Sequence, residues 1–189
     1  EDIALALVVA DKKWGSYQAD ANNLINNIFT YELENGQILK PGDVWGGKKA
    51  VNPSYLAPAW YKVFKQYTNN SAWDGVVAKS YEIIDLSKDP LTGLVPNWTT
   101  STGGSSQLVN WDPHKNDYHY DACRTPWRIG VDFLWYGDAN AQEFSNKIGS
   151  FFQSRGASSI VDGYYLNGSS YGQYHNSSFV GPAACAVLA

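Results

Sequence analysis

The chain has 189 residues, which is enough for one domain with a sizeable buried core. Its formal net charge is −4 and its Lys and Arg residues form no cluster, which disfavours a nucleic-acid partner because phosphate binding needs grouped cations. No apolar run is long enough to cross a bilayer. The two cysteines, Cys123 and Cys185, are too few for a disulfide framework or a cysteine-rich metal site, and the sequence does not decide whether they pair.

Hydrophobic periodicity predicts seven helices. Their ranges are 3–14, 20–34, 53–67, 71–86, 124–136, 139–154 and 176 to the end. The first is apolar almost all round, which predicts burial on every side, whereas the second is amphipathic, with Leu24, Ile25 and Ile28 on one face. Asn52 followed by Pro53 predicts an N-cap with proline at the first position of the third helix.

The fifth predicted helix is again apolar on most sides and the sixth is amphipathic, so buried helices alternate with half-exposed ones. This alternation predicts an all-α fold in which an inner ring of helices is covered by an outer ring, as in a barrel or toroid of helical hairpins. A long helical bundle is the alternative. No short repeat is visible, which disfavours a solenoid.

Two loops, 40–51 and 93–121, are rich in Gly, Trp, Asp and Asn. The second is long for a compact domain, and such loops are usually functional or disordered. Its aromatic residues argue against disorder. Each loop precedes a predicted helix, so we expect both to gather at one end of the barrel and to line a cleft. The high aromatic content, 8 Trp and 13 Tyr, suits contact with sugar rings, although most of these residues are expected in the core.

The segment 117–128 holds the sharpest candidate for chemistry. Asp121 lies where a helix begins, and Arg124 follows three residues later on the same face. A carboxylate held by a cation and by a tyrosine hydroxyl is what a general base for water activation requires. The alternative is that Asp121 is an N-cap with a structural ion pair, and the pattern by itself favours that alternative.

Several phrases, in this order along the chain, resemble glycoside hydrolase family 8: EDIALALVVADKKWGS, LKPGDVWGG, NPSYLAPAWYKVF, GLVPNW, YDACRTPWRIGVDFLWYGD, IVDGY and HNSSFVGP. The resemblance covers nearly the whole chain. It implies an (α/α)6 barrel, of which this chain holds a part, and inverting hydrolysis of β-1,4-linked glycans without a metal or another cofactor. The family includes endoglucanases, xylanases, lichenan-cutting enzymes and chitosanases.

The resemblance also assigns roles to residues. Asp121 matches the catalytic base of the endoglucanase-like subgroup, and Tyr120 and Arg124 match residues that support it. Trp45 matches a tryptophan that stacks on a glucose ring, and its position between glycines on a loop agrees with that role; support of the loop is the alternative. Tyr118 and Trp111, on the long loop, complete the predicted substrate contacts.

The family's general acid is a glutamate in a Ser-Glu-Gly motif, and no such motif is present here. The resemblance places that motif before Glu1, together with a further active-site aspartate, and places the last helices after Ala189. We therefore expect one partial catalytic domain that holds the base but not the acid. Asp2, Asp43, Asp112 and Asp117 are poor substitutes because nothing in the sequence indicates a raised pKa.

The resemblance further implies a secreted bacterial enzyme that is a monomer when complete and that binds a β-1,4-linked polysaccharide or oligosaccharide. Two other classes compete with this hypothesis. One is a carbohydrate-binding remnant without catalysis, and the other is a purely structural helical domain, which leaves the Gly- and Trp-rich loops unexplained. His114, His119 and His175 lack the spacing of metal ligands, and hydrogen bonding is the expected role of His175.

Overall fold

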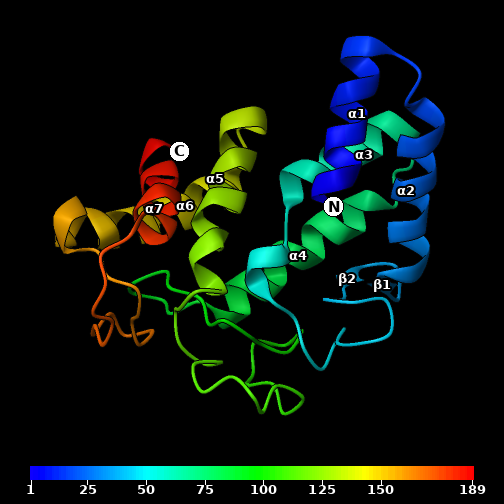
Figure 1. Ribbon diagram of the computed structural model, residues 1–189. Coiled ribbons are helices and arrows are strands. Elements are labelled where there is room, and N and C mark those ends of the chain that lie inside the picture. The colour runs from blue at the N-terminus through cyan, green and yellow to red at the C-terminus, as the bar shows by residue number, and fades with distance from the viewer.

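A computed structural model describes residues 1–189 and consists mainly of helices joined by long loops (Figure 1). The α-helices are α1 (Asp2–Trp14), α2 (Gln18–Tyr31), α3 (Pro58–Thr68), α4 (Trp73–Ser87), α5 (Thr125–Tyr136), α6 (Ala139–Arg155) and α7 (Ser177–Leu188). Three short 3-10 helices are η1 (Pro53–Tyr55), η2 (Ala122–Arg124) and η3 (Ala157–Ser159). All seven predicted helices are therefore present.

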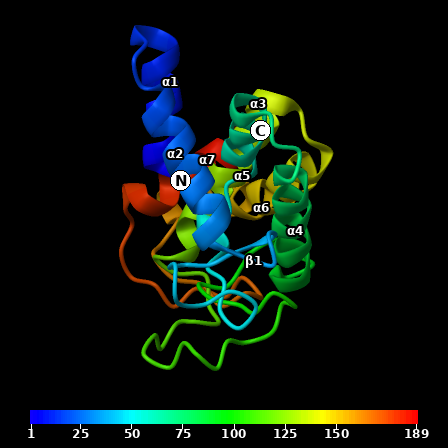
Figure 2. The same ribbon diagram turned by 90° about the vertical axis from the view of Figure 1, so that its right-hand side faces the viewer.

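The helices pack as hairpins. α1 packs on α2, α3 on α4, and α5 on α6, while α1, α3, α5 and α7 also contact one another in that order. The odd-numbered helices thus form one row with α1 and α7 at its two ends, and the even-numbered helices lie along its outside (Figures 1 and 2). The predicted inner and outer helices are confirmed, as an open row in this chain.

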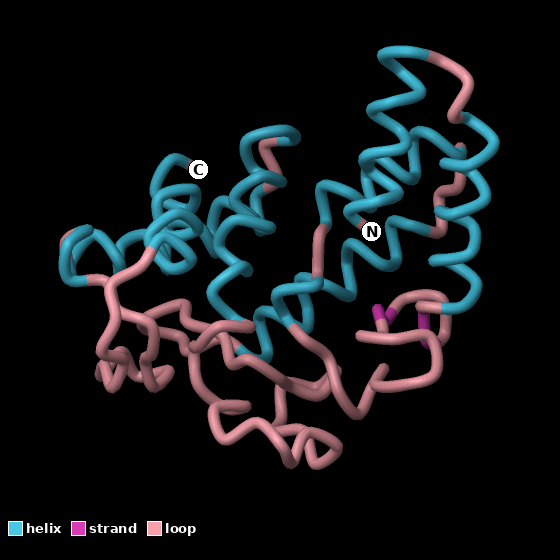
Figure 3. Tube along the Cα trace, viewed as in Figure 1, coloured by secondary structure: helices cyan, strands magenta, loops and turns pink.

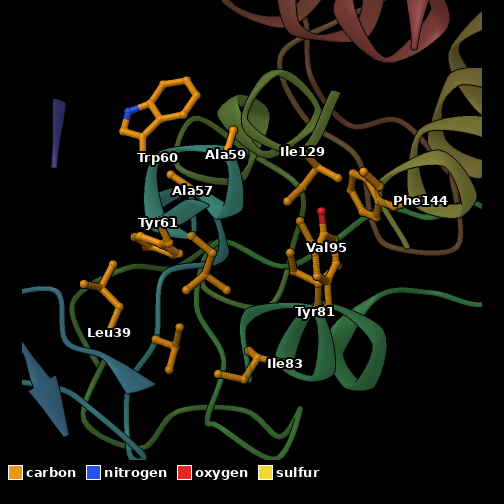
Figure 4. Packing of buried hydrophobic residues seen from close by; sticks show 14 of the residues in the cluster. Leu39, Ala57, Ala59, Trp60, Tyr61, Tyr81, Ile83, Val95, Ile129 and Phe144 are labelled. Atoms are coloured by element: carbon orange, nitrogen blue, oxygen red, sulfur yellow. The ribbon is translucent and has the colours of Figure 1, made fainter. Parts of the chain in front are cut away.

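One apolar cluster of 35 buried residues runs through the row. Figure 4 shows side chains from different elements meeting in it: Tyr81 from α4, Val95 from the long loop, Ile129 from α5 and Phe144 from α6. Removal of this apolar surface from water is the main force that holds the hairpins together.

The first helix departs from its predicted burial on every side. Only Ala4 and Val8 of α1 are buried, whereas Ile3 is 72% exposed and Val9 is 56% exposed. The reason is the position of α1 at one end of the row, where α2 and α3 supply most of its packing. α7 lies at the other end, and its Leu188 is 76% exposed.

The third predicted helix is wrong in one respect. Asn52 is the predicted N-cap and accepts a hydrogen bond from the Ser54 N–H at 3.1 Å, but the helix that follows is only the 3-10 turn η1. The backbone leaves the helical conformation at Ala57 (φ −129°, ψ 71°), and α3 begins at Pro58. A residue before proline avoids the helical region, and proline cannot donate an N–H, so the second proline restarts the helix.

A two-stranded hairpin, β1 (Leu33–Glu34) paired with β2 (Ile38–Leu39), replaces the predicted end of the second helix. Asn35 and Gly36 both have positive φ and lie at the centre of the turn, which is closed by a hydrogen bond from the Gln37 N–H to the Glu34 carbonyl. An Asn-Gly pair is the preferred sequence for such a turn. The predicted helix 20–34 did not take this turn into account and therefore extended too far.

The long loops gather at one end of the helices, as predicted (Figure 3). Residues 40–52, 93–121 and 160–176 form this loop layer. Backbone hydrogen bonds join its parts, because Val51 pairs with Thr99 and Tyr118 pairs with Tyr164. Elsewhere, Cys123 and Cys185 are free thiols, and none of the helices has the length and apolar character needed to cross a membrane.

Candidate active site

The Asp121 carboxylate lies in the loop layer, immediately before η2 and α5. Its side chain makes no capping hydrogen bond; instead, its Oδ1 accepts from Nη2 of Arg124 at 2.8 Å. Asp121 therefore stands at the N-cap position of η2 without a side-chain cap, whereas the ion pair of that alternative is present. The side chain is 32% exposed, so water can reach it while one oxygen is fixed by the cation.

The guanidinium of Arg124 is held in turn by two other groups. Its Nε and Nη2 donate to the hydroxyl of Ser54 at 3.1 and 2.9 Å, and its carbon lies 5.4 Å from the centroid of the Tyr55 ring. Ser54 and Tyr55 belong to η1, which the break before α3 leaves beside the start of α5. The structure thus brings Asp121 and Arg124 together as predicted, and it adds Ser54.

The Tyr120 hydroxyl does not bind the Asp121 carboxylate. It donates to Oδ2 of Asp162 at 3.0 Å and accepts from Nδ2 of Asn176 at 3.3 Å. Burial by itself would raise the pKa of Asp162, but hydrogen bonds from the Tyr174 N–H and from Tyr120 outweigh it and lower that pKa. Tyr120 therefore ties the turn that carries Asp121 to the last loop of the layer.

Asn97, which the sequence reasoning did not single out, braces the same turn. Its side chain is buried, its Oδ1 accepts from the N–H groups of His119 (3.2 Å) and Ala122 (2.9 Å), and its Nδ2 donates to Asp112 at 3.1 Å. These two N–H groups lie on either side of Asp121. One buried amide therefore fixes the backbone that carries the candidate base.

Three tryptophans from two loops form an aromatic cluster. The ring centroids of Trp45 and Trp98 are 5.6 Å apart, and those of Trp45 and Trp111 are 5.4 Å apart. Trp98 is buried, Trp45 is half-buried and Trp111 is 60% exposed. Trp45 therefore supports its loop and, with Trp111, also keeps open aromatic surface of the kind that sugar rings contact.

The prediction that Tyr118 contacts substrate is wrong. Its side chain is fully buried, with its ring 5.7 Å from Phe152 and 5.9 Å from Phe179, and its burial raises the pKa of the hydroxyl. The backbone pairing of Tyr118 with Tyr164 turns the ring toward α6 and α7. Its place on a loop predicts a cleft residue, whereas the side chain anchors that loop in the core.

A polar hollow of about 360 Å³ lies beside Arg124. Its lining includes Glu1, Asp2, Glu32, Lys40, Arg124 and Arg128. The Asp2 carboxylate is bound by both terminal nitrogens of Arg128, at 2.5 and 2.8 Å, and by Nε1 of Trp60 at 2.8 Å. The hydrogen bonds from Arg128 lower the pKa of Asp2 from 3.8 to about 2, so Asp2 is unsuited to donate a proton.

Glu1, in the same hollow, has a raised pKa. Burial raises the pKa of its side chain from 4.5 to about 7, against the opposing effect of the nearby positive charges. A carboxyl that keeps its proton near neutral pH has the property that a general acid needs. The sequence reasoning did not consider Glu1.

The histidines take structural positions. The rings of His114 and His119 lie 4.4 Å apart, and Nδ1 of His114 is 3.1 Å from Asp117. Nδ1 of His175 is 2.7 Å from the carbonyl oxygen of Ile160, which confirms the expected hydrogen-bonding role. No three side chains of His, Cys, Asp or Glu come together in a group that could hold a metal ion.

Comparison with known proteins gives consistent matches. The family model described as glycosyl hydrolases family 8 matches residues 1–189. Endoglucanase A of Acetivibrio thermocellus is 46% identical over 196 residues, covering 100% of this chain and 40% of that protein. Endoglucanase 2 of Ruminiclostridium josui is 45% identical over 194 residues, covering 100% of this chain and 41% of that protein.

Among solved structures, that of a beta-1,3-1,4-glucanase from Paenibacillus sp. X4 superposes with a TM-score of 0.90 at 31% identity, over 99% of this chain and 55% of the other. Its fold is the (α/α)6 barrel, which confirms the predicted fold class. The chain spans about two-fifths of the length of the two endoglucanases named above.

Proposed function

Because the chain belongs to glycosyl hydrolase family 8, we propose that it is the part of a β-1,4-glucan-cutting enzyme that carries the general base, Asp121. The observation that supports this role most directly is the geometry of the carboxylate. Arg124 holds Oδ1 at 2.8 Å, while no protein group donates to Oδ2. The second oxygen is thus left to accept a proton from water.

Hydrolysis with inversion needs such a base on one side of the sugar ring. As the water oxygen attacks the anomeric carbon, the base takes its proton, the glycosidic bond breaks, and a second carboxyl protonates the departing oxygen. The two carboxyl groups stand ~6.5–9.5 Å apart to leave room for the water. We propose that the second carboxyl lies outside these 189 residues, in a polypeptide of the length of the relatives. Glu1, which lines the same hollow as Arg124, is the alternative within the chain.

The aromatic cluster gives the proposed enzyme its contact with substrate. Trp45 and Trp111 offer partly open rings in the same loop layer as Asp121. Apolar ring faces stack on the C–H faces of glucose, and a linear β-1,4-linked chain could extend from this cluster past the base. The size of a polymeric substrate favours secretion of the enzyme, and we propose that it acts as a monomer.

The test is Asp121→Asn in a polypeptide of the length of the relatives that contains this segment. Release of reducing ends from β-1,4-glucan should fall by ~10²–10⁴-fold, the usual contribution of general-base catalysis, while oligosaccharide binding and melting temperature stay close to wild type. Asp85→Asn, which changes an exposed aspartate on α4, is the matched control. Retention of more than about a tenth of wild-type turnover by Asp121→Asn would contradict the role of base.

A carbohydrate-binding remnant is the second candidate, because the aromatic cluster by itself would suffice for binding. It predicts that the wild-type polypeptide binds glucan without releasing reducing ends. The stereochemistry of the product, followed by NMR at early times, tests inversion separately, since an inverting enzyme releases the α-anomer first from a β-linked glucan.

A further inference from the structure

Ser54 has a hydroxyl whose hydrogen-bonding direction is fixed by its neighbours. The residue is fully buried, and its Oγ donates to Oδ1 of Asn52 at 2.7 Å. Asn52 is 1% exposed and is held in place because the same oxygen caps η1 through the Ser54 N–H. A serine hydroxyl has a single proton, so with that proton given to Asn52 only its lone pairs remain for other partners.

Those lone pairs meet the guanidinium of Arg124. Nε and Nη2 of Arg124 both donate to Oγ of Ser54, and Nη2 also donates to Oδ1 of Asp121. The Arg124 side chain is 41% exposed, and a long side chain open to water has many rotamers available. The Ser54 hydroxyl selects the rotamer in which the planar fork of Arg124 also reaches Asp121.

We propose that Ser54 is a positioning residue that acts on Asp121 through Arg124, with Asn52 fixing the direction of its hydroxyl. This inference rests on the proposed role of Asp121 as the base. The relay orients the carboxylate so that Oδ2 stays directed toward the attacking water. Ser54 contacts neither water nor substrate in this scheme, so its effect depends entirely on Arg124.

The test is a double-mutant cycle with Ser54→Ala and Arg124→Ala in the polypeptide of the relatives' length. Ser54→Ala should lower kcat by about tenfold, the size of one lost hydrogen bond to a charged group, with KM nearly unchanged. Ser80→Ala is the matched control, because Ser80 is equally buried but bonds only the Val76 carbonyl within α4. It should leave kcat unchanged.

The cycle separates positioning from a general effect on packing. If Ser54 acts through Arg124, adding Ser54→Ala to Arg124→Ala should lower kcat no further, since interacting residues are not additive. Additive losses, or wild-type kcat in Ser54→Ala, would overturn the proposal. If Ser54→Ala fails to fold, Asn52→Ala replaces it, because it removes the acceptor of the Ser54 proton; unchanged kcat in that variant would also overturn the proposal.

Asp121→Asn, measured in parallel, distinguishes failure of the proposed base from failure of the proposed positioning role of Ser54. Retained turnover in Asp121→Asn contradicts the proposed base and, with it, the reason for positioning. Lost turnover in Asp121→Asn together with an additive cycle contradicts the role of Ser54 alone.

Discussion

Trp45 is packed on one side by Trp98 and Trp111 and is still half-open, so its two candidate roles make different predictions. If it stacks on sugar, Trp45→Ala should raise KM by about fivefold, equivalent to about 1 kcal/mol for one stacked aromatic contact. Melting temperature should fall less than binding weakens. The measurements are KM on oligosaccharides and a thermal melt.

Trp14→Ala is the control for loss of an indole, because Trp14 is 68% exposed at the end of α1. Trp14→Ala should change neither KM nor the melting temperature much. A collapse of stability in Trp45→Ala, with unchanged binding per folded molecule, would mean that Trp45 only supports its loop.

Tyr118 allows a sharp test of its revised role. Its hydroxyl is buried and has no hydrogen-bond partner, so Tyr118→Phe removes an unsatisfied polar group and should leave stability unchanged or raise it by about 1 kcal/mol. KM should not change, because the side chain does not reach the cleft. Urea unfolding measures the stability.

Tyr164→Phe is the matched control for Tyr118→Phe. The Tyr164 hydroxyl accepts from the Val161 N–H at 2.9 Å, so its removal leaves a donor unpaired and should destabilise the protein by about 1 kcal/mol or more. A raised KM in Tyr118→Phe would restore Tyr118 to the substrate contacts and contradict its assignment to the core.

At the scale of the elements, the pair of Asp2 and Arg128 ties the start of α1 to α5. A carboxyl with a lowered pKa stabilises the fold fully above its ordinary pKa and loses that contribution as the pH falls toward the lowered one. The stability difference between wild type and Asp2→Asn should therefore be largest above about pH 4 and shrink toward about pH 2.

The difference should be modest, since Asp2 is 60% exposed and exposed ion pairs contribute little. Thermal melts of both proteins between about pH 2 and pH 7 check this dependence. A constant difference across that range would mean that the ion pair is not what joins the two helices.

Most helices could be predicted from the sequence because their signals are local. Apolar spacing placed α4 to within two residues at each end, and Asn176 is the N-cap of α7 where that helix was expected to begin. The errors were also local: the break at Pro58 and the Asn35-Gly36 turn both carry sequence signals that were outweighed by a longer apolar pattern.

The contacts of the candidate site are likewise of two kinds, local in sequence and distant in sequence. Asp121 and Arg124 are three residues apart, so their contact follows from one turn of the chain. Ser54 is 70 residues from Arg124, and Asp162 is 42 residues from Tyr120, so only the folded arrangement brings them together. Asn97 is likewise separated from its partners by 22 and 25 residues. The contact of the proposed base with Arg124 was predictable from the sequence, whereas the groups that hold these two residues were not.

At the scale of the whole molecule, apolar surface remains open beside α1 and beside α7. A hollow of about 360 Å³ near α1 is lined by Leu5, Val8, Val9 and Trp135, among others. A second hollow, of about 440 Å³, lies between α6 and α7. Each fully exposed Leu, Ile or Val forgoes ~1.5–3 kcal/mol of burial, against a total stability of ~5–15 kcal/mol.

We therefore expect the 189-residue chain by itself to release few or no reducing ends from β-glucan and to aggregate or unfold readily. If the general acid lies outside the chain, as proposed, the glycosidic oxygen would have to depart as an alkoxide, which is a poor leaving group. A reducing-sugar assay beside the polypeptide of the relatives' length, with light scattering, measures both effects. Robust activity that Glu1→Gln abolishes would instead identify Glu1 as the acid and contradict the proposed location of that group.

The separation of the loop layer from the helices has a consequence for how such enzymes diversify. The side chains that would meet a glycan, Trp45, Trp111 and Asp121, lie on loops, whereas the apolar cluster that stabilises the fold comes largely from the helices. Mutations at exposed loop positions such as Val44 and Trp111 can thus reshape the cleft while the helical packing persists. The turn at 117–124 is different, because the side chain of Tyr118 is buried in the core. Evolution is free to vary the specificity of this scaffold at the exposed loop positions, and is constrained at the loop residues of the apolar cluster, Val51, Leu94, Val95 and Tyr118.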